Sequence, residues 1–384
     1  MNEDDFKISP SGRLVPTIEG VKAFVPNPLP PAALNMQRLV KPLERATRAL
    51  GELSGVGRTL PNPELLTRPF ARVEAVASSK IEGTVSPAPE LLMLERSPDT
   101  QAHSDTREVN NYNTALRYGL TRVNDLPLSK RLFCELHKIL LEGVSFDRGA
   151  RFVPGELKRE QNWIGARTIK NARFVPPPPG ESMDALDELE KFIHNENDLP
   201  LLIKLALIHY QFEAIHPYPD GNGRVGRLII PLMLCEQKAM SQPLLYLSTF
   251  FEKHYNEYID HMFNVSRSGT WDKWVEFFLL AVLESSEGAL RKAHAIQDLQ
   301  RTYMERIRSA RSSALLAKLV ESLFFVPAIT IPLAVRELGI SYNSAKKLMA
   351  RLIELHIATP MPGDIKPQWY FASEIIDVVN SQGT

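Results

Sequence analysis

The residues best suited to chemistry lie in one short run near the middle of the chain, HPYPDGNGRVGR, from His216 to Arg227. The run combines an imidazole, a single carboxylate at Asp220, two arginines and three glycines. A loop that only reversed the chain direction would not need this set. The combination indicates a general base, a cation ligand and a phosphate-binding turn placed close together.

The turn within this run is predicted to bind phosphate. Helical patterns place the end of one helix near Ile215 and the start of the next near Asn222. The first N–H groups of a helix have no partner inside it and carry partial positive charge, which suits a phosphate. Gly221 and Gly223 let phosphate oxygens approach the backbone because they lack a Cβ atom, and Asn222 can donate from its side-chain amide.

Four more side chains complete the predicted site. Arg224 and Arg227 are three residues apart, so they share a helix face beside the turn, and guanidinium groups bind phosphate oxygens well. Asp220 supplies one carboxylate, and Mg²⁺ is usually held by one or two carboxylates together with substrate phosphates. His216 is suited to general-base catalysis near neutral pH. These residues predict phosphoryl or nucleotidyl transfer from a nucleoside triphosphate to a hydroxyl nucleophile.

The elements that must position this run are predicted to be mostly helical. Apolar residues three and four apart predict helices over residues 35–57, 62–83, 105–120, 129–144, 182–196, 199–215, 223–237, 248–266 and 270–310. Residues 150–180 lack this helical spacing of apolar residues. The stretches NWIGA and ARFVP flank a polar turn, which predicts a short β-hairpin. Four prolines end the segment. Residues 1–33 are rich in proline and are predicted to form an extended arm on the body.

The organisation changes around residue 311. Residues 330–361 have the pattern of a helix, a glycine turn and a second helix, and residues 357–373 predict two short strands around a Pro-Gly turn. Together they predict a small winged-helix domain. The domain could serve in packing or dimerisation, or it could bind DNA. Lys346, Lys347 and Arg351 form only a thin basic stripe, which does not decide between these roles.

The composition narrows the class of protein. In the 384-residue chain, 45 Lys and Arg balance 45 Asp and Glu, so nucleic acid or an anionic membrane would have to bind a local patch. Cys134 and Cys235 lie in apolar helical patterns and are expected to be free thiols. The acidic start lacks the features of a signal peptide, and no apolar run has the length of a membrane span. A cytoplasmic protein with no membrane partner is expected.

The central run resembles the Fic motif, H-P-F-x-D-G-N-G-R-x-x-R, and departs from it only at Tyr218, where phenylalanine is usual. The resemblance implies an all-α Fic fold with a short β-hairpin flap, followed here by the winged-helix domain. It also implies transfer of AMP from ATP to a hydroxyl side chain of a target protein, with His216 as the base and Asp220 as the Mg²⁺ ligand. Relatives with lysine at the position of Gly223 act as kinases, so glycine favours AMP transfer. Some relatives use other nucleotide-type donors or remove AMP, and the motif does not exclude either.

Two further segments extend the resemblance. NWIGARTIKNARFVPPPP, from residue 162, is similar to the family's flap, which pairs with the target's main chain; this places Ile164 and Gly165 against the nucleotide. Tyr258 matches an aromatic position that contacts adenine in relatives, with core packing as an equal alternative. Trp163 is expected in the core, and His209 is expected to be a hydrogen-bonded structural histidine.

The stretch SSKIEG, Ser78 to Gly83, resembles the family's inhibitory motif. Ser78 and Glu82 are four residues apart and so lie on one helix face. In relatives this glutamate pairs with the second arginine of the motif, here Arg227, and occupies the site of the ATP γ-phosphate. A carboxylate already bound there must leave before ATP can sit productively. The resemblance therefore implies an enzyme held back by its own Glu82.

These observations divide the chain into an N-terminal arm and helices with the inhibitory motif (1–100), a Fic catalytic domain (101–310) and a winged-helix domain (311–384). The predicted partners are ATP, with Mg²⁺, and a target protein with an exposed hydroxyl residue. Self-modification and a homodimer are open possibilities. The alternative function is a DNA-binding regulator in which the Fic unit senses nucleotide, although binding alone would require neither His216 nor Asp220.

Overall fold

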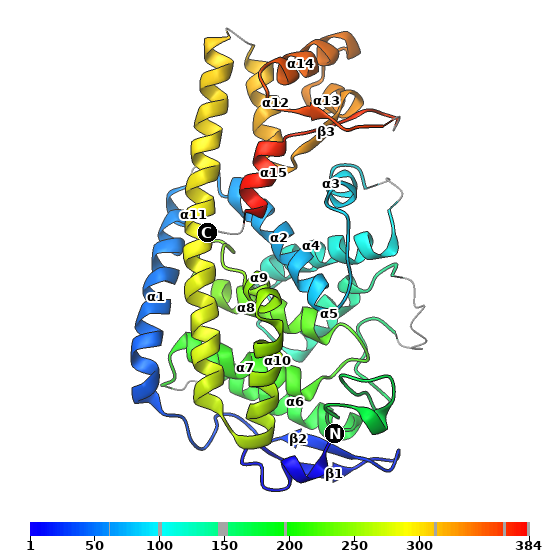
Figure 1. The fold of residues 1–384 in the computed structure, drawn as a ribbon, viewed down its shortest axis with the longest axis vertical. Coiled ribbons are helices and arrows are strands. Elements are labelled where there is room, and N and C mark those ends of the chain that lie inside the picture. Colours follow the sequence, from blue (N-terminus) through cyan, green and yellow to red (C-terminus); the bar gives the residue numbers. More distant parts are fainter. Residues whose placement is uncertain are drawn as a thin grey trace.

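The chain folds into a mostly helical body, with two small sheets at opposite ends of the molecule (Figure 1). The computed structural model describes residues 1–60, 62–98, 102–144, 153–195, 198–310, 313–363 and 366–381. The first residues of the irregular segment predicted from 150, and the predicted domain boundary at 311, fall outside these ranges. Within them, no helix is both long and apolar enough to cross a membrane.

The N-terminal segment is more ordered than an extended arm. A 3₁₀ turn, η1 (Glu3–Phe6), is followed by two antiparallel strands, β1 (Gly12–Pro16) and β2 (Lys22–Pro26), with Leu14 opposite Phe24. The sequence prediction missed this hairpin because its prolines stand at the strand ends, where no ladder hydrogen bond is lost.

Eleven helices in the described ranges up to residue 310 form the body. They are α1 (Met36–Thr59), α2 (Glu64–Ile81), α3 (Ala88–Arg96), α4 (Ser104–Arg122), α5 (Lys130–Leu140), α6 (Pro179–His194), α7 (Leu201–Ile215), α8 (Asn222–Glu236), α9 (Ser248–Lys253), α10 (Tyr255–Ser268) and α11 (Trp271–Ser309). The predicted helices are present with shifted ends, except that the one predicted over residues 248–266 is divided into α9 and α10 at His254. The nine-residue α3 was not predicted.

The two helices that flank the motif lie in the centre of the body. α7 and α8 are apolar on nearly all sides, and almost every residue in them is buried. A helix of this composition must be surrounded by protein. The 39-residue α11 runs along one side, with α1 packed along it (Figure 1). The loop between α7 and α8 is therefore fixed at both ends by the main core.

The predicted hairpin at residues 162–175 is reduced to one antiparallel bridge. Ile164 and Phe174 pair, and the Ile164 N–H donates to the Phe174 carbonyl at 2.9 Å. The N–H of Phe24 in β2 donates to the carbonyl of Val175 at 2.9 Å. We call residues 162–175 the flap segment. Its support comes mainly from the N-terminal hairpin, which explains why it needs no long strands of its own.

The C-terminal residues form a separate group of elements at the top of Figure 1. In order these are α12 (Ala314–Phe325), β3 (Ala328–Thr330), α13 (Ile331–Leu338), α14 (Tyr342–Glu354), β4 (Thr359–Pro360), β5 (Trp369–Phe371) and α15 (Ser373–Asn380). The three strands pair in the order β3-β5-β4. The predicted helix pair and two short strands are present, while α12, β3 and α15 were not predicted.

Candidate active site

The predicted site is built on the loop that joins α7 to α8. His216 ends α7 with its backbone in the left-handed region, at φ 49° and ψ 60°. Gly221, at φ 78°, precedes α8, and no side chain caps that helix. The N–H groups of the first turn of α8 are therefore left for an anion, as the sequence predicts.

The loop is held from inside by Asn222. Its side-chain Oδ1 accepts from the Tyr218 N–H at 2.8 Å, and its Nδ2 donates to the Tyr218 carbonyl at 2.7 Å. Asn222 is 2% exposed. Both polar atoms of this amide fix the turn, and the prediction that its Nδ2 also donates to a phosphate stays a prediction.

Carbonyl groups of the loop are also held from outside, by residues that the sequence analysis did not single out. Lys158 and Asn162 bond the carbonyls of residues 215–218, and His137 bonds that of Asp220 at 3.0 Å. The His137 Nδ1 accepts from the Gly155 N–H at 2.8 Å, so its Nε2 must carry the proton given to Asp220. The sequence analysis gave His137 no role, because nothing in its spacing links it to the motif.

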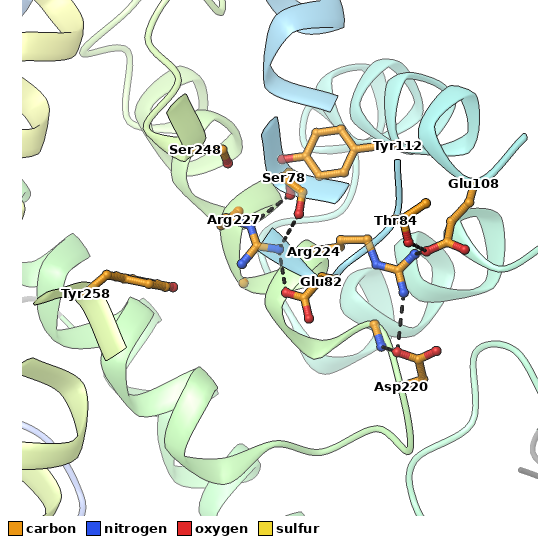
Figure 2. A network of polar contacts seen from close by, with 12 residues as sticks. Ser78, Glu82, Thr84, Glu108, Tyr112, Asp220, Arg224, Arg227, Ser248 and Tyr258 are labelled. Carbon is orange, nitrogen blue, oxygen red and sulfur yellow. Dashed lines mark hydrogen bonds and ion pairs between the residues drawn. The ribbon is translucent and has the colours of Figure 1, made fainter. Parts of the chain in front are cut away.

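Arg227 is bound by the segment that resembles the inhibitory motif (Figure 2). Its Nη2 lies 2.6 Å from the Glu82 carboxylate and 3.0 Å from the Ser78 carbonyl, and its Nε donates to the Ser78 hydroxyl at 2.8 Å. A Cβ added to Gly223 would lie 2.1 Å from the Glu82 carboxylate. The Glu82 carboxylate therefore lies directly against the motif glycine, in the space where the sequence predicts a phosphate.

Arg224 faces a different carboxylate. Its side chain is fully buried and forms an ion pair with Glu108 of α4, and its Nη2 lies 3.3 Å from Asp220 (Figure 2). Glu108 also accepts from the Thr84 hydroxyl at 2.9 Å. The two motif arginines therefore have different carboxylate partners, Glu108 for Arg224 and Glu82 for Arg227.

His216 has the electronic state that a base requires. Its Nδ1 lies 3.2 Å from the Glu213 carbonyl, so Nδ1 carries the proton and Nε2 is the free acceptor. Burial lowers the pKa of His216 to about 4, and the positive charge of Lys158 contributes in the same direction. The imidazole is therefore neutral at pH 7 and able to accept a proton.

Asp220 is the carboxylate best placed to hold a cation. Its side chain is 36% exposed, and its Oδ1 accepts from the Gly221 N–H at 2.6 Å. Within the described ranges its other oxygen has no bond that would compete with a cation. Among the described residues, no group of three or more His, Cys, Asp or Glu side chains gathers to hold a metal. The donor set therefore fits Mg²⁺, which accepts one carboxylate plus phosphate oxygens, better than a metal held by protein alone.

Glu213, whose role the sequence left open, lies beneath α8. A Cβ on Gly226 would lie 2.4 Å from its Oε1, so that glycine leaves room for the carboxyl group. Burial raises the pKa of Glu213 to about 8, against the opposing charge of Arg227. The raised pKa favours the protonated form of this carboxyl group beside Arg227.

The predicted residues outside the motif differ in how deeply they are buried. Gly165 is exposed, with φ 84°, and Ile164 is half-buried against the core of the flap segment. Tyr258 is 1% exposed, and its hydroxyl donates to the Nε2 of His209 at 2.8 Å. This agrees with the core alternative for Tyr258 and the structural role predicted for His209. Trp163 is 39% exposed, so the prediction that it packs in the core is wrong.

Comparison with protein families identifies the two central regions. Residues 40–121 match the family described as Fic/DOC family N-terminal, and residues 127–234 match the Fic/DOC family. The first match contains Ser78 and Glu82, and the second contains the whole loop from His216 to Arg227.

Curated relatives are similar over parts of their length. A probable protein adenylyltransferase of Aquifex aeolicus is 40% identical over 68 residues, which are 18% of this chain and 21% of the relative. The protein adenylyltransferase Fic of Drosophila virilis is 26% identical over 203 residues, which are 51% of this chain and 38% of the relative. The chain thus spans about a fifth to two fifths of these relatives.

Solved structures share the fold at low identity. A Fic family protein from Desulfovibrio desulfuricans superposes with a TM-score of 0.58 and 17% identity, covering 90% of this chain and 98% of that one. A Fic domain containing signaling protein from Bacteroides thetaiotaomicron gives a TM-score of 0.53 and 20% identity, over 65% of this chain and 97% of that one.

Proposed function

We propose that this chain, a member of the Fic/DOC family over residues 40–234, transfers AMP from ATP to a hydroxyl side chain of a target protein. The observation that carries the proposal is the loop from His216 to Arg227, which joins a neutral imidazole to an uncapped helix start. The named relatives, which are adenylyltransferases, support the same reaction.

In this reaction the triphosphate lies across the start of α8. The N–H groups of the first turn and the Arg227 guanidinium bind its oxygens, and their fixed positive charge stabilises the charge that develops at phosphorus. The hydroxyl of the target gives its proton to the Nε2 of His216 and forms a bond to the α-phosphorus. The bond between the α-phosphorus and the bridging oxygen breaks, and pyrophosphate leaves with the electron pair.

Mg²⁺, when bound, would neutralise charge on the phosphates, and Asp220 is the side chain that would hold it. Arg224 keeps Asp220 oriented from 3.3 Å, and its own charge is balanced by Glu108. The hydrogen bond from the Gly221 N–H fixes the carboxylate from its other side.

Glu82 restrains this activity by occupying the guanidinium that the γ-phosphate requires. The contact at 2.6 Å, together with two hydrogen bonds to Ser78, holds Arg227 toward α2. A triphosphate must displace the carboxylate to bind with its α-phosphorus in line for attack. The exposed edge of the flap segment, next to Ile164 and Gly165, would then pair with the main chain of an extended target segment.

The residues from 311 onward are proposed to be a winged-helix domain, attached to an arm and inhibitory region (1–100) and a catalytic region (101–310). Its order of helix, strand, two helices and two strands supports this assignment. Arg351 of α14 is already paired with Glu354 and bonded to the Ala310 carbonyl, which favours packing over DNA binding for this surface.

The test is the position of the transferred label. The Glu82→Gly chain is incubated with Mg²⁺ and cell lysate, and with ATP labelled at either the α- or the γ-phosphate. We expect protein labelling from α-labelled ATP only, and none in a Glu82→Gly, His216→Ala chain. Labelling from γ-labelled ATP would indicate a kinase and contradict the proposal.

A further inference from the structure

The loop that carries His216 is held by two side chains outside the motif, Lys158 and Asn162. The Asn162 Nδ2 donates to the carbonyl of His216 at 3.0 Å and to that of Tyr218 at 2.9 Å. The backbone N–H of Lys158 donates to the Pro217 carbonyl at 2.9 Å.

The Lys158 ammonium completes this set. It donates to the Ile215 carbonyl at 3.4 Å and to the Asn162 Oδ1 at 2.8 Å, so it also fixes which way the Asn162 amide points. Each of the four successive carbonyls from residues 215 to 218 therefore accepts a hydrogen bond from Lys158 or Asn162. We call Lys158 and Asn162 the carbonyl brace.

The brace acts where the backbone needs support. His216 is one of the described non-glycine residues with positive φ, and such a conformation persists only where the surroundings fix it. Relaxing it would rotate the imidazole away from the start of α8. The Asn222 amide holds the loop at Tyr218 from within but does not bond the carbonyl of His216.

Lys158 is also an unusual residue to find in this place. It is 5% exposed, and among the described residues no carboxylate forms an ion pair with it. Burial lowers the pKa of Lys158 to about 7. Burying an ammonium group without a counter-ion costs free energy. The hydrogen bonds that this group makes must therefore compensate, either through a functional role or by stabilising the loop conformation.

We propose that Lys158 and Asn162 are positioning residues for catalysis, which hold His216 in its left-handed conformation and thereby aim its Nε2 at the incoming hydroxyl. Asn162 is the first residue of the flap segment, so the brace also links the base to the segment proposed to bind the target. This inference rests on the proposed function and adds two residues to its machinery.

The matched control is Gln161, the residue next to Asn162. Its Nε2 also donates to two carbonyls at 2.9 Å, those of Asn162 and Pro176, and it is 8% exposed. Neither carbonyl belongs to the loop that carries His216. Gln161→Met and Asn162→Leu therefore each remove a side-chain amide that donates to two carbonyls. Only Asn162→Leu removes hydrogen bonds to the loop that carries His216.

The experiment measures AMP transfer in full-length chains that also carry Glu82→Gly, with α-labelled ATP, Mg²⁺ and a fixed concentration of lysate protein. Rates are divided by active sites counted from ATP binding, so unfolded protein does not contribute. Asn162→Leu is expected to lower the apparent kcat about 10–100-fold, the effect of a small misplacement of a catalytic group, and to change KM for ATP by less than about twofold. Gln161→Met should retain kcat within about threefold by the same reasoning.

A second pair of variants grades the effect. Lys158→Met removes one bond to the loop and the partner of Asn162, so its loss of kcat should be smaller than that of Asn162→Leu. Lys158→Arg keeps donors and charge and should recover part of it. The proposed positioning role is wrong if Asn162→Leu leaves kcat equal to that of the Glu82→Gly chain, or if Asn162→Leu and Gln161→Met lower kcat equally. If the Glu82→Gly chain itself transfers no AMP, the proposed function is wrong instead.

Discussion

The two motif arginines sit three residues apart on α8, and both are buried, yet their carboxylate partners differ. Arg224 pairs with Glu108, whose side chain is 8% exposed and is also bonded to Thr84 within the core. Arg227 pairs with Glu82, whose side chain is 31% exposed. Glu82 is the residue that caps the C-terminal end of α2, directly before a glycine with positive φ.

This difference decides which arginine is available to a ligand. Removing Glu108 from its place would leave Arg224 buried with one partner fewer and a cavity in the core, so we expect that pair to be harder to break than the pair of Arg227 and Glu82. Glu82 needs only a movement at the end of a helix to reach water. The middle of α2 stays fixed meanwhile, because Glu74 accepts hydrogen bonds from Tyr112 at 3.0 Å and from the Ser248 N–H at 3.0 Å.

The largest effect that separates the two pairs is expected from Glu108→Ala. Loss of this partner leaves a buried guanidinium poorly compensated, which should lower the free energy of unfolding by about 3 kcal/mol. Urea denaturation measures it. Glu82→Ala is the control and should cost less, since Glu82 is partly exposed and Arg227 keeps its two hydrogen bonds to Ser78. Similar losses in the two variants would remove the distinction between them.

Glu82→Gly should have the next largest effect, on activity rather than stability. Freeing Arg227 is expected to raise AMP transfer about 10–100-fold, as a typical coupling energy between an inhibitory contact and a ligand allows. The measurement is the initial rate of label transfer from α-labelled ATP to lysate protein. A rate equal to that of the unaltered chain would mean that the Glu82 contact does not restrain the enzyme.

Ser78→Ala should relieve part of the inhibition by Glu82. The lost hydrogen bond from the Arg227 Nε contributes about 0.5–1.5 kcal/mol, so transfer should rise about two- to tenfold. Ser79→Ala is the matched control, because Ser79 is equally buried and its hydroxyl has no hydrogen-bond partner in the structure. A Ser79→Ala chain as active as Ser78→Ala would show that the effect comes from α2 in general.

The smallest effect is expected from pH. Burial is the largest influence on the pKa of Glu82 and would raise it, but the charge and hydrogen bond of Arg227, together with the Arg224 charge, outweigh burial and hold the pKa below the ordinary 4.5. A depressed carboxyl pKa means that the ion pair is intact above about 4.5 and is lost only as the pH falls through the lower folded value. The ratio of rates between Glu82→Gly and the unaltered chain should therefore stay constant from about pH 5.5 to 7.5. A ratio that falls toward 1 within that range would mean that a group other than Glu82 causes the inhibition.

The sequence was sufficient for features that depend on neighbours along the chain. Two strongly apolar stretches and a glycine-rich turn predicted the junction between α7 and α8, which begins and ends within a residue of the expected positions. The four-residue spacing of Ser78 and Glu82 predicted that both face the same way, and both contact Arg227.

The sequence was insufficient where the partner lies far along the chain. Nothing in the spacing of Glu108 marks it as the partner of Arg224, 116 residues later, and the same holds for Asn162 and His216. Trp163 was placed in the core because it is large and apolar, but that tendency does not say which face of an irregular segment is covered. Such contacts are fixed by the packing of whole helices.

The most direct test of the account is where Arg227 points when ATP is bound. In crystals of the Glu82→Gly chain soaked with ATP and Mg²⁺, we expect the phosphates to lie at the start of α8, with the Arg227 guanidinium within hydrogen-bond distance of a γ-phosphate oxygen. If ATP binds elsewhere, or if Arg227 remains bonded to Ser78 alone while the γ-phosphate makes no contact with it, the claim that Glu82 and the γ-phosphate compete for one site is contradicted.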